Sequence, residues 1–266
     1  MTIRKTALDK ITSYRNEYFS SMPEFQELFI ELMIAGADCY LLQMDNKEVG
    51  YAIKNSDGIL IEFYVLKPYI PQSNDFFRQV LTDLSVSEIF CKSFDSLLLN
   101  NCLRCGYAYE VIGVLYRDYA EPLVKHDTGV RMVKADLSSV ETLLDQDDSI
   151  KELFETEQQL IDFIQNGYVF EFYLKDVFIG CGTAIRTNPD WDYCDLGVWV
   201  KPSNRGSSYG SQIILNLRNY ALINNLKPSC GCAIDNIASQ KTIVKSGFVS
   251  KHQLINFKTR VPEKPD

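Results

Sequence analysis

An internal near-repeat is the feature that most limits how this chain of 266 residues can fold. Residues 91–107 align without a gap with residues 232–248. Both segments combine a short strand pattern, a helical pattern and a glycine that precedes an aromatic residue, and in each an Asp or Asn stands eleven positions before that glycine. Self-similarity of this kind favours a duplicated folding unit over one continuous domain.

Earlier parts of the two halves also correspond. Val49-Gly50 matches Ile179-Gly180, each in the second strand of an expected hairpin, and Lys67-Pro68 matches Lys201-Pro202, each after a long strand. The order of strands and helices therefore repeats. It predicts an α+β chain of two tandem units, each with a mixed, mostly antiparallel sheet flanked by helices.

We place the first domain at residues 1–120 and the second at residues 130–266. The segment 118–129 between them lacks clear periodicity and contains a proline and a glycine, which is typical of a linker. At the start of the chain, apolar residues at helical spacing predict helices over residues 6–35.

Composition narrows the class of protein. The chain is 46% hydrophobic and 23% charged, as expected of a folded protein, and its formal net charge is −8. That charge opposes polyanions, so we expect neither nucleic acid nor a membrane as a partner. We find no apolar stretch of signal-peptide or membrane-span length, so we expect a cytoplasmic protein whose eight cysteines are reduced thiols.

The second half contains a strand-to-helix turn suited to an anion. A β-rich run ends at Val200, Pro202 ends the ladder, and residues 205–211 supply an arginine, two glycines and three serines before a helical pattern at 209–224. The first N–H groups of a helix lack internal partners and carry partial positive charge. Small residues let a phosphate approach them, and Arg205 adds a full charge. The alternative is a plain solvent-exposed turn with a serine cap.

Two motifs resemble those of a known family. The pattern Val200-x-Pro202-x-x-Arg205-Gly206-x-x-x-Gly210-Ser211 looks like the acyl-CoA signature of the GNAT superfamily, whose core is R/Q-x-x-G-x-G/A. Downstream, Asn236-x-x-Ser239 followed by Gly247-Phe248 resembles the family's N-x-x-A/S…G-F segment, and residues 230–242 resemble a bacterial branch with a degenerate N-terminal half. The resemblance covers roughly residues 130–260. It implies acetyl-CoA, or another acyl-CoA, as co-substrate, and no metal.

The resemblance also implies which residues contact the acyl-CoA. The strand before the turn splays from its neighbour, and its backbone bonds the pantetheine arm; this part corresponds to Val198, Trp199 and Val200. The turn takes the pyrophosphate, and corresponds to Arg205, Gly206, Ser207, Ser208, Tyr209, Gly210 and Ser211. Asn236 and Ser239 would lie beside the pantetheine arm and the thioester.

The chain departs from the family pattern at two positions. Ser208 stands where the family has its first motif glycine; a serine fits there if its φ is negative, and its hydroxyl could then bond a phosphate. Ile243 stands where many members carry a tyrosine that protonates the leaving thiolate. That acid is missing or is supplied from elsewhere, by Tyr220, Tyr193 or water.

The catalytic base is the least defined part of the site. Family bases are often glutamates on the strand before the turn, at a position that falls near Cys194. Asp192 and Asp195 flank it and are our candidates, with a solvated strand end as the alternative. We expect Cys194 to be a packed thiol, because no histidine is near it in sequence and nothing visible would lower its pKa.

Together these features predict an N-acyltransferase that moves an acetyl or other acyl group from acyl-CoA to an amine by direct attack. The acceptor is a small-molecule or peptide amine that the sequence does not specify. The alternative, motivated by Ile243 and the unassigned base, is an acyl-CoA-binding sensor or scaffold. The N-terminal half lacks an Arg-Gly turn after Pro68, so we expect it to bind no acyl-CoA and to support the fold, the acceptor site or a homodimer interface.

Overall fold

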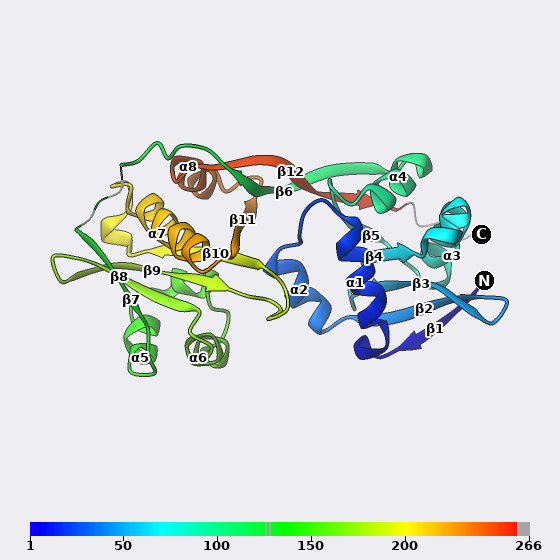
Figure 1. Cartoon of the computed structure of the whole chain (residues 1–266), viewed down its shortest axis with the longest axis horizontal. Helices are drawn as coiled ribbons and strands as arrows, with labels where there is room; N and C mark the ends of the chain where they lie inside the picture. Colours follow the sequence, from blue (N-terminus) through cyan, green and yellow to red (C-terminus); the bar gives the residue numbers. More distant parts are fainter. Residues whose placement is uncertain (126, 128, 260–266) are drawn as a thin grey trace, which may run out of the picture. The chain divides into compact units, whose positions relative to one another are not determined.

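The chain folds into two compact units. A computed structural model describes residues 1–125, 127 and 129–259 (Figure 1). The first unit comprises Met1–Val114 together with the strand residues from His252 onward, and the second comprises Leu115–Lys251. Positions 126 and 128 of the expected linker, and 260–266 of the expected second domain, lie outside the described residues.

The first unit is built on a mixed sheet with the strand order β1-β2-β3-β4-β5-β12-β6. Neighbouring strands from β1 to β4 are antiparallel, and β4 and β5 are parallel. Helix α4 packs on β4 and β5 and also contacts α3. In chain order its elements are β1 (Thr2–Thr6), the 3₁₀ helix η1 (Leu8–Ile11), α1 (Thr12–Ser21), α2 (Leu28–Ala35), β2 (Asp38–Met44), β3 (Lys47–Lys54), β4 (Ile59–Val65), η2 (Lys67–Gln72), α3 (Ser73–Asp83), β5 (Glu88–Lys92), α4 (Ser96–Cys105) and β6 (Ala108–Tyr119).

The second unit repeats this order with the strands β7-β8-β9-β10-β11-β6. Figure 1 shows α5 and α6 on one face of its sheet and α7 on the other, where α7 contacts β9, β10 and β11. In chain order the elements are β7 (Val130–Lys134), α5 (Ser139–Leu144), the 3₁₀ helix η3 (Asp148–Glu152), α6 (Glu157–Gln165), β8 (Val169–Leu174), β9 (Val177–Ile185), β10 (Tyr193–Val200), η4 (Pro202–Asn204), α7 (Tyr209–Ile223), β11 (Lys227–Ala233), α8 (Ile237–Lys245) and β12 (Phe248–Lys258).

The C-terminal strand corrects the expected domain division. We expected the second domain to continue to residue 266, but from His252 onward β12 belongs to the first unit. The reason is its pairing: Leu254 to Lys258 form an antiparallel ladder with β5. In the second unit the strand beside β11 is β6, which comes from the first half of the sequence.

Local signals explain why the two halves fold alike. The hairpin turns Asp45-Asn46 and Lys175-Asp176 both have left-handed φ values, +51° and +61° in the first and +48° and +63° in the second. Two-residue turns with both φ values positive match the right-handed twist of the strands they join. The tandem α+β fold predicted from the sequence is confirmed at this level.

The corresponding helices α4 and α8 begin and end in the same way. Asp95 accepts a hydrogen bond from the Leu98 N–H at 3.1 Å, and Asn236 accepts one from the Ser239 N–H at 3.0 Å. Such side-chain caps satisfy N–H groups that the first turn of a helix leaves open. Each helix is followed by a glycine with positive φ, at +67° and +94°.

The core of the second unit fixes the short segment between α5 and α6 against the sheet. Ile150, Phe154 and Leu160 are buried in one cluster with Val169 and Trp199. Because Trp199 is a residue of β10, this cluster ties η3 to that strand.

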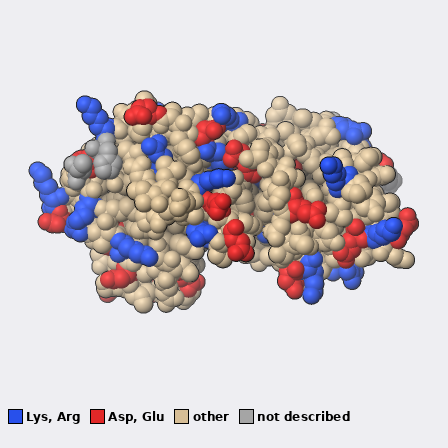
Figure 2. All heavy atoms as spheres, in the orientation of Figure 1, with Lys and Arg blue, Asp and Glu red and all other residues tan. Residues whose placement is uncertain are grey.

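Charges of both signs are interspersed over the face drawn in Figure 2. Among the described residues, no helix combines the length and apolar character needed to cross a bilayer.

Candidate functional site

Strands β10 and β11 of the second unit run parallel but pair only over their first residues. The register joins Tyr193 to Lys227 and Asp195 to Ser229, and the ladder ends there. Residues 196–200 of β10 stay paired with β9 on their other edge. From residue 196 onward, the edge of β10 that faced β11 is therefore open to a ligand, which is the divergence that the family resemblance implied.

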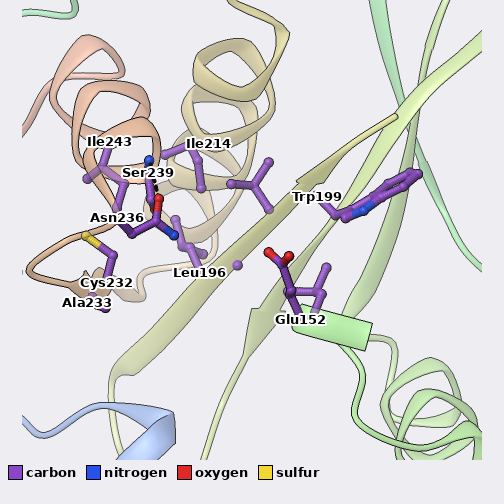
Figure 3. Close-up of a pocket in the computed structure, with 13 residues that line it drawn as sticks. Glu152, Leu196, Trp199, Ile214, Cys232, Ala233, Asn236, Ser239 and Ile243 are labelled. Carbon is purple, nitrogen blue, oxygen red and sulfur yellow. Dashed lines mark hydrogen bonds between the residues drawn. The ribbon is translucent and has the colours of Figure 1, made fainter. Parts of the chain in front are cut away.

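A cavity of about 240 Å³ lies where the two strands diverge (Figure 3). Residues 196–199 of β10 and 231–233 of β11 form part of its wall. Helices α7 and α8 and the segment around η3 supply the rest: Ile214, Asn236, Ser239, Ile243, Glu152 and Leu153. Four of the residues expected to contact acyl-CoA line this cavity, namely Val198, Trp199, Asn236 and Ser239.

The expected pyrophosphate turn connects β10 to α7. After Val200 and the short helix η4 it continues through residues 205–208 into the first turn of α7, which holds Tyr209, Gly210 and Ser211. Gly206 has φ +81°, and a Cβ built there would meet no atom within 4 Å. Ser208 precedes α7 without making a side-chain cap. The first N–H groups of α7 are therefore not occupied by a cap from Ser208, as an anion site requires.

The negative φ with which a serine would fit at position 208 is not what the structure has. Ser208 has φ +64°, in the left-handed region that a glycine adopts without steric cost.

Ser208→Gly is expected to stabilise the second unit. Removing the Cβ relieves left-handed strain of about 1 kcal/mol, and no cap is lost with the hydroxyl. We expect thermal unfolding to shift up by about 1–3 °C. Ser207→Gly is the matched control, because Ser207 does not have a positive φ; its glycine variant should unfold at the same or a lower temperature. A Ser208→Gly variant that melts lower than the wild type would contradict the strain argument.

Arg205 does more than supply charge to the turn. Its Nε–H donates to the Val200 carbonyl at 3.1 Å, and a terminal N–H donates to Ser149 Oγ at 2.8 Å. The Trp199 indole N–H donates to the same hydroxyl oxygen at 2.9 Å. Ser149 belongs to η3, so Arg205 and Trp199 link the turn and β10 to that segment.

The η3 segment is held in place along its length. Asp147 caps it by accepting from the Ser149 N–H at 2.9 Å, and hydrogen bonds from Ser149, with the charge of Arg205, lower the pKa of Asp147. Lys151 pairs with Asp148 at 2.6 Å. On the cavity side, a Cβ on Gly197 would lie 2.6 Å from Leu153 Cδ1, so the glycine is what allows Leu153 to approach β10 so closely.

Glu152, at the end of η3, is the site residue that sequence reasoning missed. Figure 3 shows its carboxylate pointing into the cavity, across from Asn236. The sequence gives no local signal for this position, because the segment reads only as a polar break between two helices.

The predicted bases Asp192 and Asp195 do not line the cavity. Asp195 lies close enough to the buried thiols of Cys194 and Cys230 to contribute, after burial itself, to their raised pKa values. Burial raises the pKa of Cys194 to about 12, which fits the packed thiol that we expected. The catalytic roles of Asp192 and Asp195 remain predictions.

The alternative acids do not reach the cavity either. Ile243 lines it and is 3% exposed, so the position of the family's tyrosine is apolar here. Tyr220 packs on Phe170 with ring centroids 4.8 Å apart, and Tyr193 lies under the Lys227 ammonium.

The first unit has the same divergence, filled by its own side chains. Strands β4 and β5 pair in parallel only at their first two positions. Beyond them Gln26 bridges the strands: its amide N–H donates to Glu62 of β4 at 2.9 Å, and its oxygen accepts from Lys92 of β5 at 2.6 Å. Arg15 makes two further hydrogen bonds to Glu62, at 2.8 and 3.0 Å.

The remaining groups of this buried network connect it to α4. Lys92 also donates to the Tyr18 hydroxyl at 2.8 Å, which in turn donates to Asp95 at 2.7 Å. Asp95 is the counterpart of Asn236 in the second unit. In the first unit, the residues at the positions equivalent to the cavity wall therefore bond to one another.

The described residues contain no group of three or more His, Cys, Asp or Glu side chains placed to hold a metal ion. Cys102 and Cys105, two residues of α4 three positions apart, are free thiols, as the sequence predicts for the cysteines of this chain.

Comparison with known families agrees with this architecture. One family of acetyltransferase (GNAT) domains matches residues 7–119, and a second matches residues 118–249. The chain therefore belongs to the GNAT superfamily, with two such domains in tandem, as the motifs predicted.

Solved structures show the same fold over nearly the whole chain. A GNAT-family acetyltransferase from Colwellia psychrerythraea superposes with a TM-score of 0.86 at 20% identity, covering 98% of this chain and all of the other. A tandem GNAT protein from the clavulanic acid biosynthesis pathway gives 0.64 at 11% identity, covering 97% and 98%. A GCN5-related N-acetyltransferase from Sphaerobacter thermophilus gives 0.58 at 10% identity, covering 83% and 80%. No curated protein matches the sequence.

Proposed function

We propose that the second unit binds acetyl-CoA or another acyl-CoA and transfers the acyl group to an amine. The observation that carries this proposal is the cavity between the diverging strands β10 and β11, adjoined by a turn that opens a helix N-terminus. The N–H groups of residues 205–211 would bond the pyrophosphate oxygens. The open edge of β10 would bond the pantetheine amides and bring the thioester to the cavity.

The chain's own groups supply positioning and polarisation. Backbone N–H groups on the open edge of β10 can polarise the thioester carbonyl, and the cavity walls hold the amine against it. Asn236 and Ser239 line the opposite side of the cavity, where they would flank the pantetheine arm.

Direct attack by the amine fits the thiols at the site better than a covalent route through cysteine. Burial raises the pKa of Cys194 and of Cys232, which lines the cavity. A thiol held protonated at neutral pH is a poor nucleophile.

The second candidate is an acyl-CoA-binding sensor without turnover, favoured by the apolar Ile243 in the cavity wall. Titration calorimetry with acetyl-CoA and a thiol-release assay with a panel of amines separate the two. Transfer predicts both binding and amine-dependent thiol release. Tight binding with no release above the uncatalysed rate for any amine would support the sensor, and no binding would contradict both.

We further propose that the first unit binds no acyl-CoA. The space between its diverging strands β4 and β5 is filled by Gln26, Glu62 and Lys92. Helix α3, which follows β4, is preceded by η2 with two prolines and not by a glycine turn. One acyl-CoA per chain is the stoichiometry that the calorimetric titration should give.

A further inference from the structure

We propose that Glu152 receives the positive charge of the acceptor and takes its proton, so that the acceptor is a cationic amine. This inference rests on the proposed acyl transfer and adds to it the acceptor class and the base. It assigns to Glu152 the role of base that the sequence suggested for Asp192 and Asp195.

The first support is the composition of the cavity. Among the described residues that line it, Glu152 carries the one charged side chain. The rest of the wall is apolar or neutral, as with Leu196, Ile214 and Ile243. A single carboxylate in such a wall attracts a cation and disfavours an anionic acceptor.

The second support is that the neighbouring carboxylates are already engaged and Glu152 is not. Asp147 caps η3 through Ser149, and Asp148 pairs with Lys151. Within the described part of the chain, Glu152 forms no ion pair. It therefore keeps its capacity for a ligand cation, while the two aspartates and Lys151 shape the segment that carries it.

The third support is that the segment carrying Glu152 is anchored to the sheet. Ser149 is fixed by Trp199 and Arg205, and Leu153 packs against Gly197, so anchors stand on both sides of Glu152 along the chain. Catalytic groups need such anchoring, because a misplacement of about 1 Å can cost about a hundredfold in rate.

The chemistry balances with one carboxylate. The ammonium of the acceptor gives one proton to Glu152 and becomes a nucleophilic amine. The nitrogen attacks the thioester carbon, the C–N bond forms, the C–S bond breaks, and the electron pair leaves on sulfur. The second proton of the attacking nitrogen passes to that sulfur, directly or through water. Glu152 then releases its proton to solvent, so the products are an amide, free CoA thiol and one proton.

The test compares Glu152→Gln with Glu155→Gln, a matched change at an exposed carboxylate outside the cavity. Each protein is titrated with acetyl-CoA and assayed for thiol release with 1,4-diaminobutane, tyramine, lysine amide and a peptide with a free amino terminus. Hydroxylamine, which is uncharged at neutral pH, serves as a nucleophile that needs no deprotonation.

We expect Glu152→Gln to bind acetyl-CoA within about twofold of the wild type and to lose about a hundredfold in kcat/KM for the best charged amine. Its loss with hydroxylamine should stay below about threefold, and Glu155→Gln should match the wild type throughout. Full amine turnover in Glu152→Gln, or equal losses with amines and hydroxylamine, would overturn the role of Glu152 while leaving acyl transfer intact. A wild type that binds acetyl-CoA but acetylates no amine would overturn both proposals.

Discussion

Arg205→Glu is expected to weaken acetyl-CoA binding at least about a hundredfold, a loss of about 2.7 kcal/mol. The substitution removes a cation beside the helix N-terminus and places an anion there, where the pyrophosphate of the proposed ligand would lie. It also removes the donors to Val200 and Ser149 that tie the turn to η3. Titration calorimetry at fixed ionic strength measures the effect directly.

Two further variants separate charge from positioning. Arg205→Gln keeps a donor but no charge, and the family's own signature allows glutamine there, so we expect a loss of only about tenfold. Lys175→Glu makes the same charge change at the exposed turn between β8 and β9 and should leave binding within about twofold. An unchanged affinity of Arg205→Glu for acetyl-CoA would contradict the assignment of this turn to the pyrophosphate.

Arg15→Met is expected to destabilise the first unit by about 3–5 kcal/mol, the second large effect. Glu62 is fully buried, and Arg15 donates two hydrogen bonds to it. Burial opposes the ionisation of Glu62, but the charge and hydrogen bonds of Arg15 outweigh it and lower the pKa of Glu62. Without Arg15, Glu62 keeps Gln26 and Tyr51 as neutral donors and the charge of Lys92 nearby, but it loses its ion pair. Glu31 loses its ion pair with Arg15 as well. Chemical denaturation followed by circular dichroism measures the loss.

The pH dependence of this difference has a definite sign. A carboxyl with a lowered pKa stabilises the folded state above its unfolded pKa, and that stability is lost as pH falls. In Arg15→Met the pKa of Glu62 should rise. Glu62 then becomes protonated as the pH falls, which removes its buried charge and reduces the destabilisation of the variant. The gap between wild type and variant should therefore narrow as the pH is lowered from 7 toward about 4.

Two comparison variants test how much of this loss comes from the buried pair of Arg15 and Glu62. Arg4→Met removes an exposed arginine 3.8 Å from Glu48 and should cost less than about 0.5 kcal/mol. The double variant Arg15→Met/Glu62→Leu removes both charges and should recover much of the loss. A single variant that loses under about 1 kcal/mol, or a gap that widens at low pH, would contradict the account.

Much of the fold could be predicted because its signals are local. The repeated capping residues Asp95 and Asn236 and their following glycines mark two equivalent helices in the sequence, and the structure confirms them. The pairing of β12 with β5 of the first unit could not be predicted from such local signals. Alternating residues define a strand but not its partner, and the ladder with β5 joins residues more than 150 positions apart.

The candidate site was only partly predictable for a similar reason. Asn236 and Ser239 belong to a motif of fixed spacing, Val198 and Trp199 directly precede another such motif, and all four residues line the cavity. Glu152 has no motif, because its place depends on how η3 packs on β10 through contacts distant in sequence. The network around Glu62 is also hidden, since the sequence shows a single acidic residue within an apolar strand.

The most direct measurement is a crystal structure of the protein grown with CoA. We expect one CoA per chain, with its pyrophosphate on the N–H groups of residues 205–211 and its pantetheine arm between β10 and β11, reaching the cavity that Glu152 lines. CoA bound between β4 and β5 of the first unit, or bound away from the turn at Arg205, would contradict this expectation.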